Sequence, residues 1–88
     1  MPVLKVGEKA YYDTFSGLIL CKVIALSGSA AQPTSSIKVD FELLETKQAY
    51  RKGERLCSSS LWVAPVAAVR KTKYSHVIGH YTVEATCT

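Results

Sequence analysis

Two histidines, His76 and His80, lie four positions apart, a spacing that lets two imidazoles share one metal ion on a helix. Gly79 and its neighbours are typical of loop and strand instead. In a strand, residues four apart lie about 13 Å from each other, which is too far for one ion. We therefore predict solvent-facing imidazoles and no metal site.

Hydrolytic chemistry needs a nucleophile, a base and oxyanion donors in one place, and the sequence contains no such set. Ser58–Ser60 lack the glycines of a nucleophile elbow. Asp40 and Glu42 fall on the polar face of an alternating segment, with no base to pair them. A glycine-rich phosphate loop is also missing from the sequence. We expect neither catalytic residues nor a cofactor, and hence a protein that is not an enzyme.

The three cysteines, Cys21, Cys57 and Cys87, are separated by 36 and 30 residues, which fits neither a secreted disulfide framework nor a zinc motif. We expect reduced thiols, with Cys21 acting as a small core residue. The N-terminus lacks the order of a signal peptide, and no apolar run reaches the ~18 residues of a membrane helix. These features predict a cytoplasmic protein without a membrane partner.

Aromatic side chains offer a more specific expectation. Tyr11 and Tyr12 must face opposite sides of a strand, so one of them is expected at the surface. We predict that Tyr11, Phe15 and Trp62 form a recognition patch, with ordinary packing as the alternative. Aromatic faces of this kind hold a peptide, a methylated amine or a stacked base.

Basic residues give the chain a net charge of +4 and gather in two stretches. Such an excess permits contact with the phosphates of a nucleic acid, whereas charged, solvated turns are the ordinary alternative. The candidate nucleic-acid contacts are Arg51, Lys52, Arg55, Arg70, Lys71 and Lys73.

Hydrophobic patterning predicts strands throughout. Ala10–Asp13 is a short strand, and the apolar run Leu18–Ser27 is a longer one that is buried on both faces or carries a bulge. Ser27–Ser36 is a loop of small residues. Ile37–Leu43 alternates apolar and polar residues, as an antiparallel strand with one dry face requires.

The second half of the chain is less regular. Glu45–Ser60 is polar with a turn at Gly53, and Leu61–Ala64 is an apolar strand that Pro65 ends. One helical turn at 66–68 precedes a strand over Val69–Tyr74. The tail then alternates at Tyr81, Val83 and Ala85 as a last strand.

At 88 residues the chain is one domain, over residues 1–88, because two cores of half that size would bury too little apolar surface. We divide it into a core at about 4–74 and a C-terminal extension at 75–88. Five or six short strands in so small a chain predict an all-β fold that closes as a small barrel or as two packed sheets. Small size also favours self-association.

The order of these features, ending in Val63-Ala64-Pro65-Val66-Ala67-Ala68-Val69-Arg70, resembles SH3-like barrels, in which a proline and one 3-10 turn precede the last strand. The resemblance covers about residues 4–74 and implies that fold, which hosts many functions.

A narrower stretch, Ser60–Val69, is similar to the type II dihydrofolate reductases of resistance plasmids, which are tetrameric SH3-like barrels. The matching residues shape the end of the barrel. Where that family has its pore glutamine and tyrosine, this chain has Trp62 and Ala64, and Tyr12 stands where the family has a pore lysine. The resemblance implies association and an origin on a phage, plasmid or integron cassette.

We therefore predict a non-catalytic binding module of a mobile genetic element that associates with itself and presents an aromatic and basic surface to protein or nucleic acid. One alternative is a phage structural or assembly protein whose tail strand Gly79–Ala85 pairs with a neighbouring subunit. The other is a pore-type reductase similar to type II dihydrofolate reductase.

Overall fold

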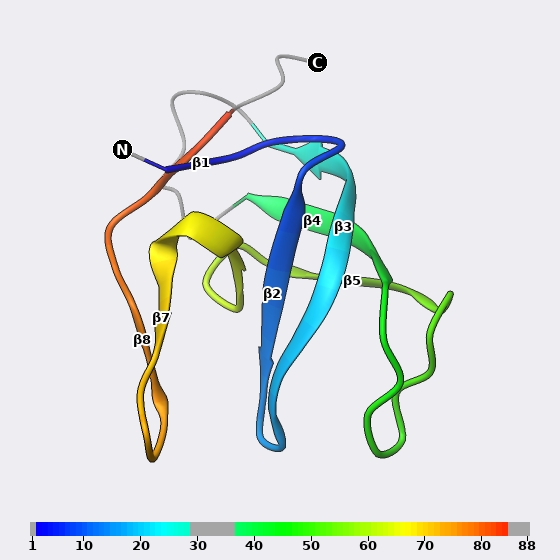
Figure 1. Ribbon diagram of the computed structural model, residues 1–88. Coiled ribbons are helices and arrows are strands. Elements are labelled where there is room, and N and C mark those ends of the chain that lie inside the picture. Colours follow the sequence, from blue (N-terminus) through cyan, green and yellow to red (C-terminus); the bar gives the residue numbers. More distant parts are fainter. Residues whose placement is uncertain (1, 29–36, 85–88) are drawn as a thin grey trace.

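The computed structural model describes residues 2–28 and 37–84 of the chain, and in this part every regular element except one helical turn is a strand (Figure 1). No described helix is long and apolar enough to cross a membrane. The elements are β1 (Val3–Leu4), β2 (Lys9–Thr14), β3 (Gly17–Ser27), β4 (Lys38–Leu43), β5 (Arg55–Ser59), β6 (Val63–Pro65), the 3-10 turn η2 (Val66–Ala68), β7 (Val69–Lys71), β8 (His76–Ile78) and β9 (Thr82–Val83).

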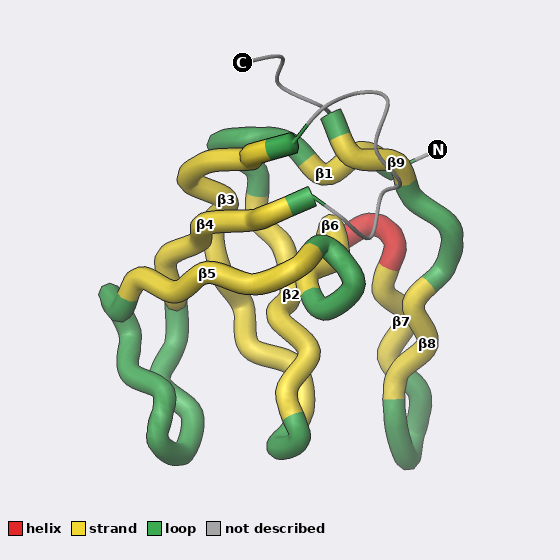
Figure 2. Tube along the Cα trace, turned by 180° about the vertical axis from the view of Figure 1, so that it is seen from behind, coloured by secondary structure: helices red, strands yellow, loops and turns green. Residues whose placement is uncertain are grey.

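Five strands form one antiparallel sheet in the order β5-β4-β3-β2-β6. The two edge strands, β5 and β6, are consecutive in the chain and are joined only by residues 60–62. The sheet therefore curls until its ends approach each other (Figure 2). The predicted all-β fold with five antiparallel strands and one 3-10 turn is confirmed. The described strands do not close a barrel, because no pairing joins β5 to β6.

The concave side of this sheet holds the core. Along β4, exposed Lys38 begins an alternation in which Val39, Phe41 and Leu43 are fully buried, as the sequence pattern predicts. The other buried members of the core cluster are Leu4, Ala10, Ile19, Cys21, Val23, Leu26, Ile37 and Val63.

The long strand β3 carries a bulge, one of the two alternatives that the sequence left open. The register between β3 and β4 shifts between Val23 and Ala25, so Ile24 is an extra residue on β3. An added residue reverses which side chains point inward. For this reason Val23 and Leu26 are both buried although they are three positions apart.

Parts of the second half of the chain differ from the prediction. Leu61 and Trp62 belong to the turn before β6, and the strand that begins at Val69 stops at Lys71 because Thr72–Ser75 forms a hydrogen-bonded turn. The polar stretch Glu45–Ser60, in which only a turn at Gly53 was predicted, also contains β5. Only Leu56 of that strand packs against the core, so an edge strand of this kind carries no alternating pattern.

The end of the sheet follows the predicted proline and helical turn. Pro65 is the last residue of β6, opposite Ala10 of β2, and it has no amide proton with which to extend the pairing. The turn η2 follows directly. It carries the chain away from the five-stranded sheet, so that β7 pairs with β8 as a separate hairpin.

The C-terminal extension folds back on its own chain. The Gly79 amide donates to the Ala68 carbonyl at 2.7 Å, and β9 pairs in parallel with β1. The predicted tail strand therefore finds its partner within the same chain, over Thr82 and Val83. Ala85 and most of the predicted loop Ser27–Ser36 lie outside the described residues.

Three connections lie at one end of the molecule: the β2–β3 turn, the β4–β5 loop and the tip of the β7–β8 hairpin (Figures 1 and 2). The strands β1 and β9 lie at the opposite end. Two hydrogen bonds join the first two connections, from the Ser16 hydroxyl to Gln48 at 2.7 Å and from Lys47 Nζ to the Leu18 carbonyl at 3.2 Å. This end carries most of the exposed functional side chains described below.

Candidate functional site

An open groove of about 500 Å³ lies beside the β2–β3 turn. Four elements form it: strand β2 with its turn, the β4–β5 loop, strand β5 and the turn before β6. Four aromatic rings line the groove together with small polar side chains. Its lining residues are Tyr12, Asp13, Thr14, Phe15, Ser16, Tyr50, Ser58 and Trp62.

Tyr12 connects the groove to the core. Its ring centroid lies 4.8 Å from that of Phe41, and the Tyr50 ring meets it edge-on at 6.0 Å. These are favourable aromatic geometries. Burial raises the pKa of Tyr12, the neighbouring Tyr50 raises it further, and a hydrogen bond from Ser58 opposes the rise. The Tyr12 phenol therefore stays uncharged at neutral pH, next to Tyr50 of the β4–β5 loop.

Phe15 and Trp62 form the exposed rim of the groove. Phe15 is fully exposed at the tip of a turn in which the Thr14 hydroxyl accepts from the Ser16 amide and donates to the Gly17 carbonyl at 2.7 Å. Trp62 is 52 % exposed. Its carbonyl accepts the Asp13 amide proton at 2.7 Å, which fixes the backbone at this point. Large apolar rings held in water by fixed turns are typical of a binding surface.

The groove carries little charge. No lysine or arginine of the described residues lines it, and Asp13 is its one carboxylate. An Asp13 carboxylate oxygen lies 3.4 Å from His76 Nε2, so this group is directed toward the β7–β8 hairpin and forms an ion pair when the imidazole is protonated. The groove is therefore suited to an uncharged, partly apolar ligand.

Of the predicted aromatic patch, Phe15 and Trp62 come together and Tyr11 does not. Tyr11 lies on the opposite face of β2, where Lys71 Nζ sits 4.7 Å from its ring centroid. Tyr12 and Tyr50 take its place. The alternation of Tyr11 and Tyr12 left their order open, and nothing in the polar sequence around Tyr50 indicated a ring that folds back against β2.

The predicted basic residues divide into two groups. One group lies on the β4–β5 loop and β5, and the other lies on the β7–β8 hairpin, on either side of the β2–β3 hairpin (Figure 1). Arg55 forms an ion pair with Glu42, with 3.6 Å between Nε and the carboxylate oxygen. The first group is Arg51, Lys52 and Arg55, and the second is Arg70, Lys71 and Lys73.

The residues considered for metal and thiol chemistry lie apart. His76 faces Asp13 and His80 is exposed, and the described residues contain no cluster of three metal-binding side chains. Cys21 and Cys57 are free thiols. Cys21 is fully buried, donates to the Ala10 carbonyl at 3.4 Å, and has its pKa raised by burial to about 12. Cys87 lies outside the described residues.

Comparison of the chain with protein-family models, with characterised proteins and with solved structures finds no match. The resemblances to SH3-like barrels and to type II dihydrofolate reductases therefore remain predictions from the sequence. The function has to be argued from the groove and its surroundings.

Proposed function

We propose that this chain is a non-catalytic binding module whose aromatic groove holds an extended segment of a protein partner. The observation that carries the proposal is the groove itself, where the rings of Tyr12, Phe15, Tyr50 and Trp62 surround one open space. Aromatic-lined grooves bind extended peptides because flat rings and hydroxyls offer apolar contact and hydrogen bonds together.

The absence of lysine and arginine from the described lining favours a peptide over a nucleic acid in this groove. A nucleotide stacked on Trp62 would bring its phosphate with it, and no cation of the lining would meet that charge. A methylated amine would need a carboxylate that faces the rings, whereas Asp13 is directed toward His76. Apolar and proline-containing peptide segments fit best.

Selection of random peptides on the immobilised protein, followed by affinity measurement on variants, tests this function. Trp62→Ala and Phe15→Ala should each weaken the selected peptides about 30-fold, the effect of losing an aromatic anchor worth about 2 kcal/mol. Both side chains are exposed, so the variants are expected to fold.

Leu61→Ala is the matched control. Leu61 is the neighbour of Trp62 and is 60 % exposed, but it does not line the groove. Its substitution should leave the affinity within about twofold of the parent. Selected peptides that bind the Trp62 and Phe15 variants as tightly as the parent protein would reject the groove as the site.

The remaining sequence predictions form part of the same proposal. Free Cys21 and Cys57 support a cytoplasmic location, where thiols stay reduced. Self-association is supported by the small size of the chain and by the position of β5 at the edge of the sheet. An origin on a mobile genetic element is supported by the resemblance alone. Assembly of phage particles and reductase activity remain the alternatives to the binding function.

A further inference from the structure

A second cavity, of about 350 Å³, lies between the start of β3 and the β7–β8 hairpin. It shares no lining residue with the aromatic groove. Three of its lining residues are lysines, one from the β4–β5 loop and two from the hairpin. The lining residues are Leu18, Lys47, Lys71, Thr72, Lys73, Tyr74, Ser75 and His76, and we call this cavity the lysine cleft.

Each lysine of the cleft is held in place without a carboxylate. Lys47 Nζ donates to the Leu18 carbonyl at 3.2 Å, Lys71 Nζ lies over the Tyr11 ring at 4.7 Å, and Lys73 Nζ lies 5.4 Å from the Tyr74 ring centroid. Among the described residues none of the three forms an ion pair, whereas Lys5 and Arg55 do so elsewhere.

No carboxylate lines the cleft among the described residues. Asp13 lies 3.4 Å from the lining residue His76, and Glu45 accepts the Leu20 amide proton at 2.9 Å. An anion placed in the cleft would be attracted by the three ammonium groups that line it. The cleft is therefore complementary to a phosphate group.

The turn that presents two of the lysines is fixed by its own hydrogen bonds. The Thr72 hydroxyl donates to the Ser75 carbonyl at 2.9 Å and accepts the Ser75 amide proton at 3.0 Å. These hydrogen bonds fix the backbone around Lys73 and Tyr74, the two residues between Thr72 and Ser75. Because the turn is already ordered, the binding of an anion costs little conformational entropy there.

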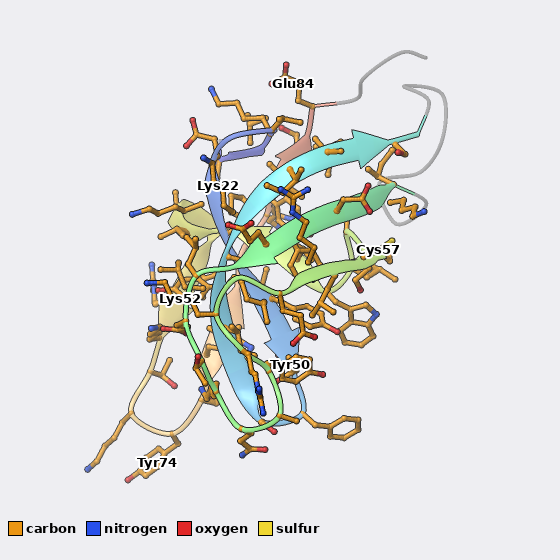
Figure 3. All side chains as sticks on the ribbon, turned by 90° about the vertical axis from the view of Figure 1, so that its right-hand side faces the viewer. Lys22, Tyr50, Lys52, Cys57, Tyr74 and Glu84 are labelled. Atoms are coloured by element: carbon orange, nitrogen blue, oxygen red, sulfur yellow. The ribbon has the colours of Figure 1, made fainter. Side chains whose placement is uncertain are left out.

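Tyr74 supplies a second kind of contact. It is 88 % exposed and projects from the tip of the β7–β8 hairpin, next to the cleft (Figure 3). Proteins that bind single-stranded nucleic acids combine two features: cations that contact the phosphate backbone, and aromatic rings on which bases stack. We propose that the lysine cleft binds the phosphodiester backbone of a single-stranded nucleic acid, with Tyr74 stacking on an adjacent base.

Fluorescence anisotropy with a labelled oligothymidylate and a labelled oligouridylate tests this site. Three phosphate contacts predict a slope of about −2 for the logarithm of affinity against the logarithm of salt concentration. The triple variant Lys47→Gln/Lys71→Gln/Lys73→Gln should lose that slope, and Tyr74→Ala should weaken binding about fivefold or more. Should the triple variant fail to fold, the exposed pair Lys71→Gln/Lys73→Gln replaces it, with a slope reduced by about 1.4.

The control variant removes the same charge from the opposite end of the molecule. Lys5→Gln/Lys9→Gln/Lys22→Gln lowers the net charge from +4 to +1, as the cleft variant does, and Lys22 lies far from Tyr74 (Figure 3). This variant should keep a slope of about −2. Equal losses in both triple variants would mean that net charge alone acts, and the proposal would be wrong.

Two further outcomes would overturn the proposal: no binding of either oligonucleotide at low salt, and binding of phosphatidylserine vesicles without binding of oligonucleotides. The aromatic groove is tested separately, because Trp62→Ala should leave oligonucleotide binding unchanged. Failure of the peptide function and failure of the lysine cleft can therefore be distinguished.

Discussion

Tyr81 is the residue that fastens the C-terminal extension to the sheet. Its hydroxyl donates to the Ser60 carbonyl and also meets the Val63 carbonyl at 3.1 Å, at the turn that carries Trp62. The ring packs against the core, and burial raises the pKa of the phenol. A single side chain thus stabilises both the tail and one wall of the aromatic groove.

Tyr81→Phe should lower the free energy of unfolding by about 1–2 kcal/mol, because the ring remains while its hydroxyl no longer reaches two carbonyls. Urea denaturation measures the change. Tyr74→Phe is the control, since that hydroxyl is on an exposed ring, and it should alter the stability by less than about 0.5 kcal/mol. Equal effects of the two substitutions would contradict the role of Tyr81.

At the level of single residues, two of the four aromatic rings of the groove could be predicted. Phe15 lies between turn-forming neighbours, so no strand partner was expected to cover it. Trp62 was placed in the same patch, although the sequence predicted a strand at Leu61–Ala64 and not the turn that exposes this ring. Tyr50 could not be found, since its position depends on how the β4–β5 loop folds back toward Tyr12. Lys47 was missed as a cleft residue for the same reason: its contact with Leu18 spans 29 positions of the chain.

At the level of elements, the β2–β3 turn sets the position of Phe15. Gly17 has a φ of 112°, in a region that favours glycine, and a Cβ atom there would lie 3.0 Å from Lys47 Nζ. The turn is thus shaped by a glycine whose missing side chain also leaves room for the lysine. Both sites depend on this turn, because it places Phe15 at the groove and Leu18 at the lysine cleft.

Gly17→Ala should destabilise the protein by about 1–3 kcal/mol, the usual strain of an alanine forced into such a conformation. Chemical denaturation measures the loss. Gly79→Ala is the matched control, because Gly79 lies outside that region and a Cβ atom would come no closer than 3.4 Å to the Ala68 carbonyl oxygen. If the Gly17→Ala variant were as stable as the Gly79→Ala variant, position 17 would not impose backbone strain on an alanine.

The sequence predicts those strands whose buried positions are apolar. β3 and β4 form the middle of the sheet, so their inward positions are apolar and the pattern is legible. β5 is an edge strand with mostly exposed or half-buried residues, and among the described strands β8 pairs with β7 alone. Both strands form through backbone hydrogen bonds to other segments, and a local hydrophobic pattern does not indicate such pairing.

At the level of the whole molecule, the core contains groups that ionise only at high pH. Cys21 has its pKa raised by burial from the ordinary 9.0 to about 12, and burial raises the pKa of Tyr12 and of Tyr81 as well. The folded state keeps these protons longer than the unfolded chain does. Stability is therefore complete below pH 9 and falls as the pH rises toward 12.

For Cys21 the expected loss is about 1.4 kcal/mol for each pH unit above 9. Denaturant unfolding at a series of pH values should show this slope in the parent protein, and Cys21→Ala should be less steep by that amount. Val39→Ala is the control: it also truncates a fully buried side chain, so it lowers stability while keeping the slope. If the free energy of unfolding fell equally steeply with pH in all three proteins, the ionisation of Cys21 would not contribute to the loss of stability.

At the scale of the whole molecule, the two proposed binding sites lie beside one hairpin. The aromatic groove and the lysine cleft have no lining residue in common, but both border the β2–β3 hairpin: the groove through β2 and the turn, and the cleft through Leu18 of β3. A partner with an apolar segment and a phosphate-bearing partner could thus be held at the same end of the protein. The open, curled sheet fixes the hairpins that present both sites (Figure 2).

Trp62 is the single tryptophan of the chain, so its fluorescence reports the aromatic groove alone. Titration with a selected peptide should shift its emission to shorter wavelength and reduce its quenching by iodide, because a seated peptide covers a ring that is 52 % exposed in the free protein. The same saturating change is expected for Leu61→Ala. Emission and quenching that stay unchanged when the peptide is bound would contradict the aromatic groove as the binding site.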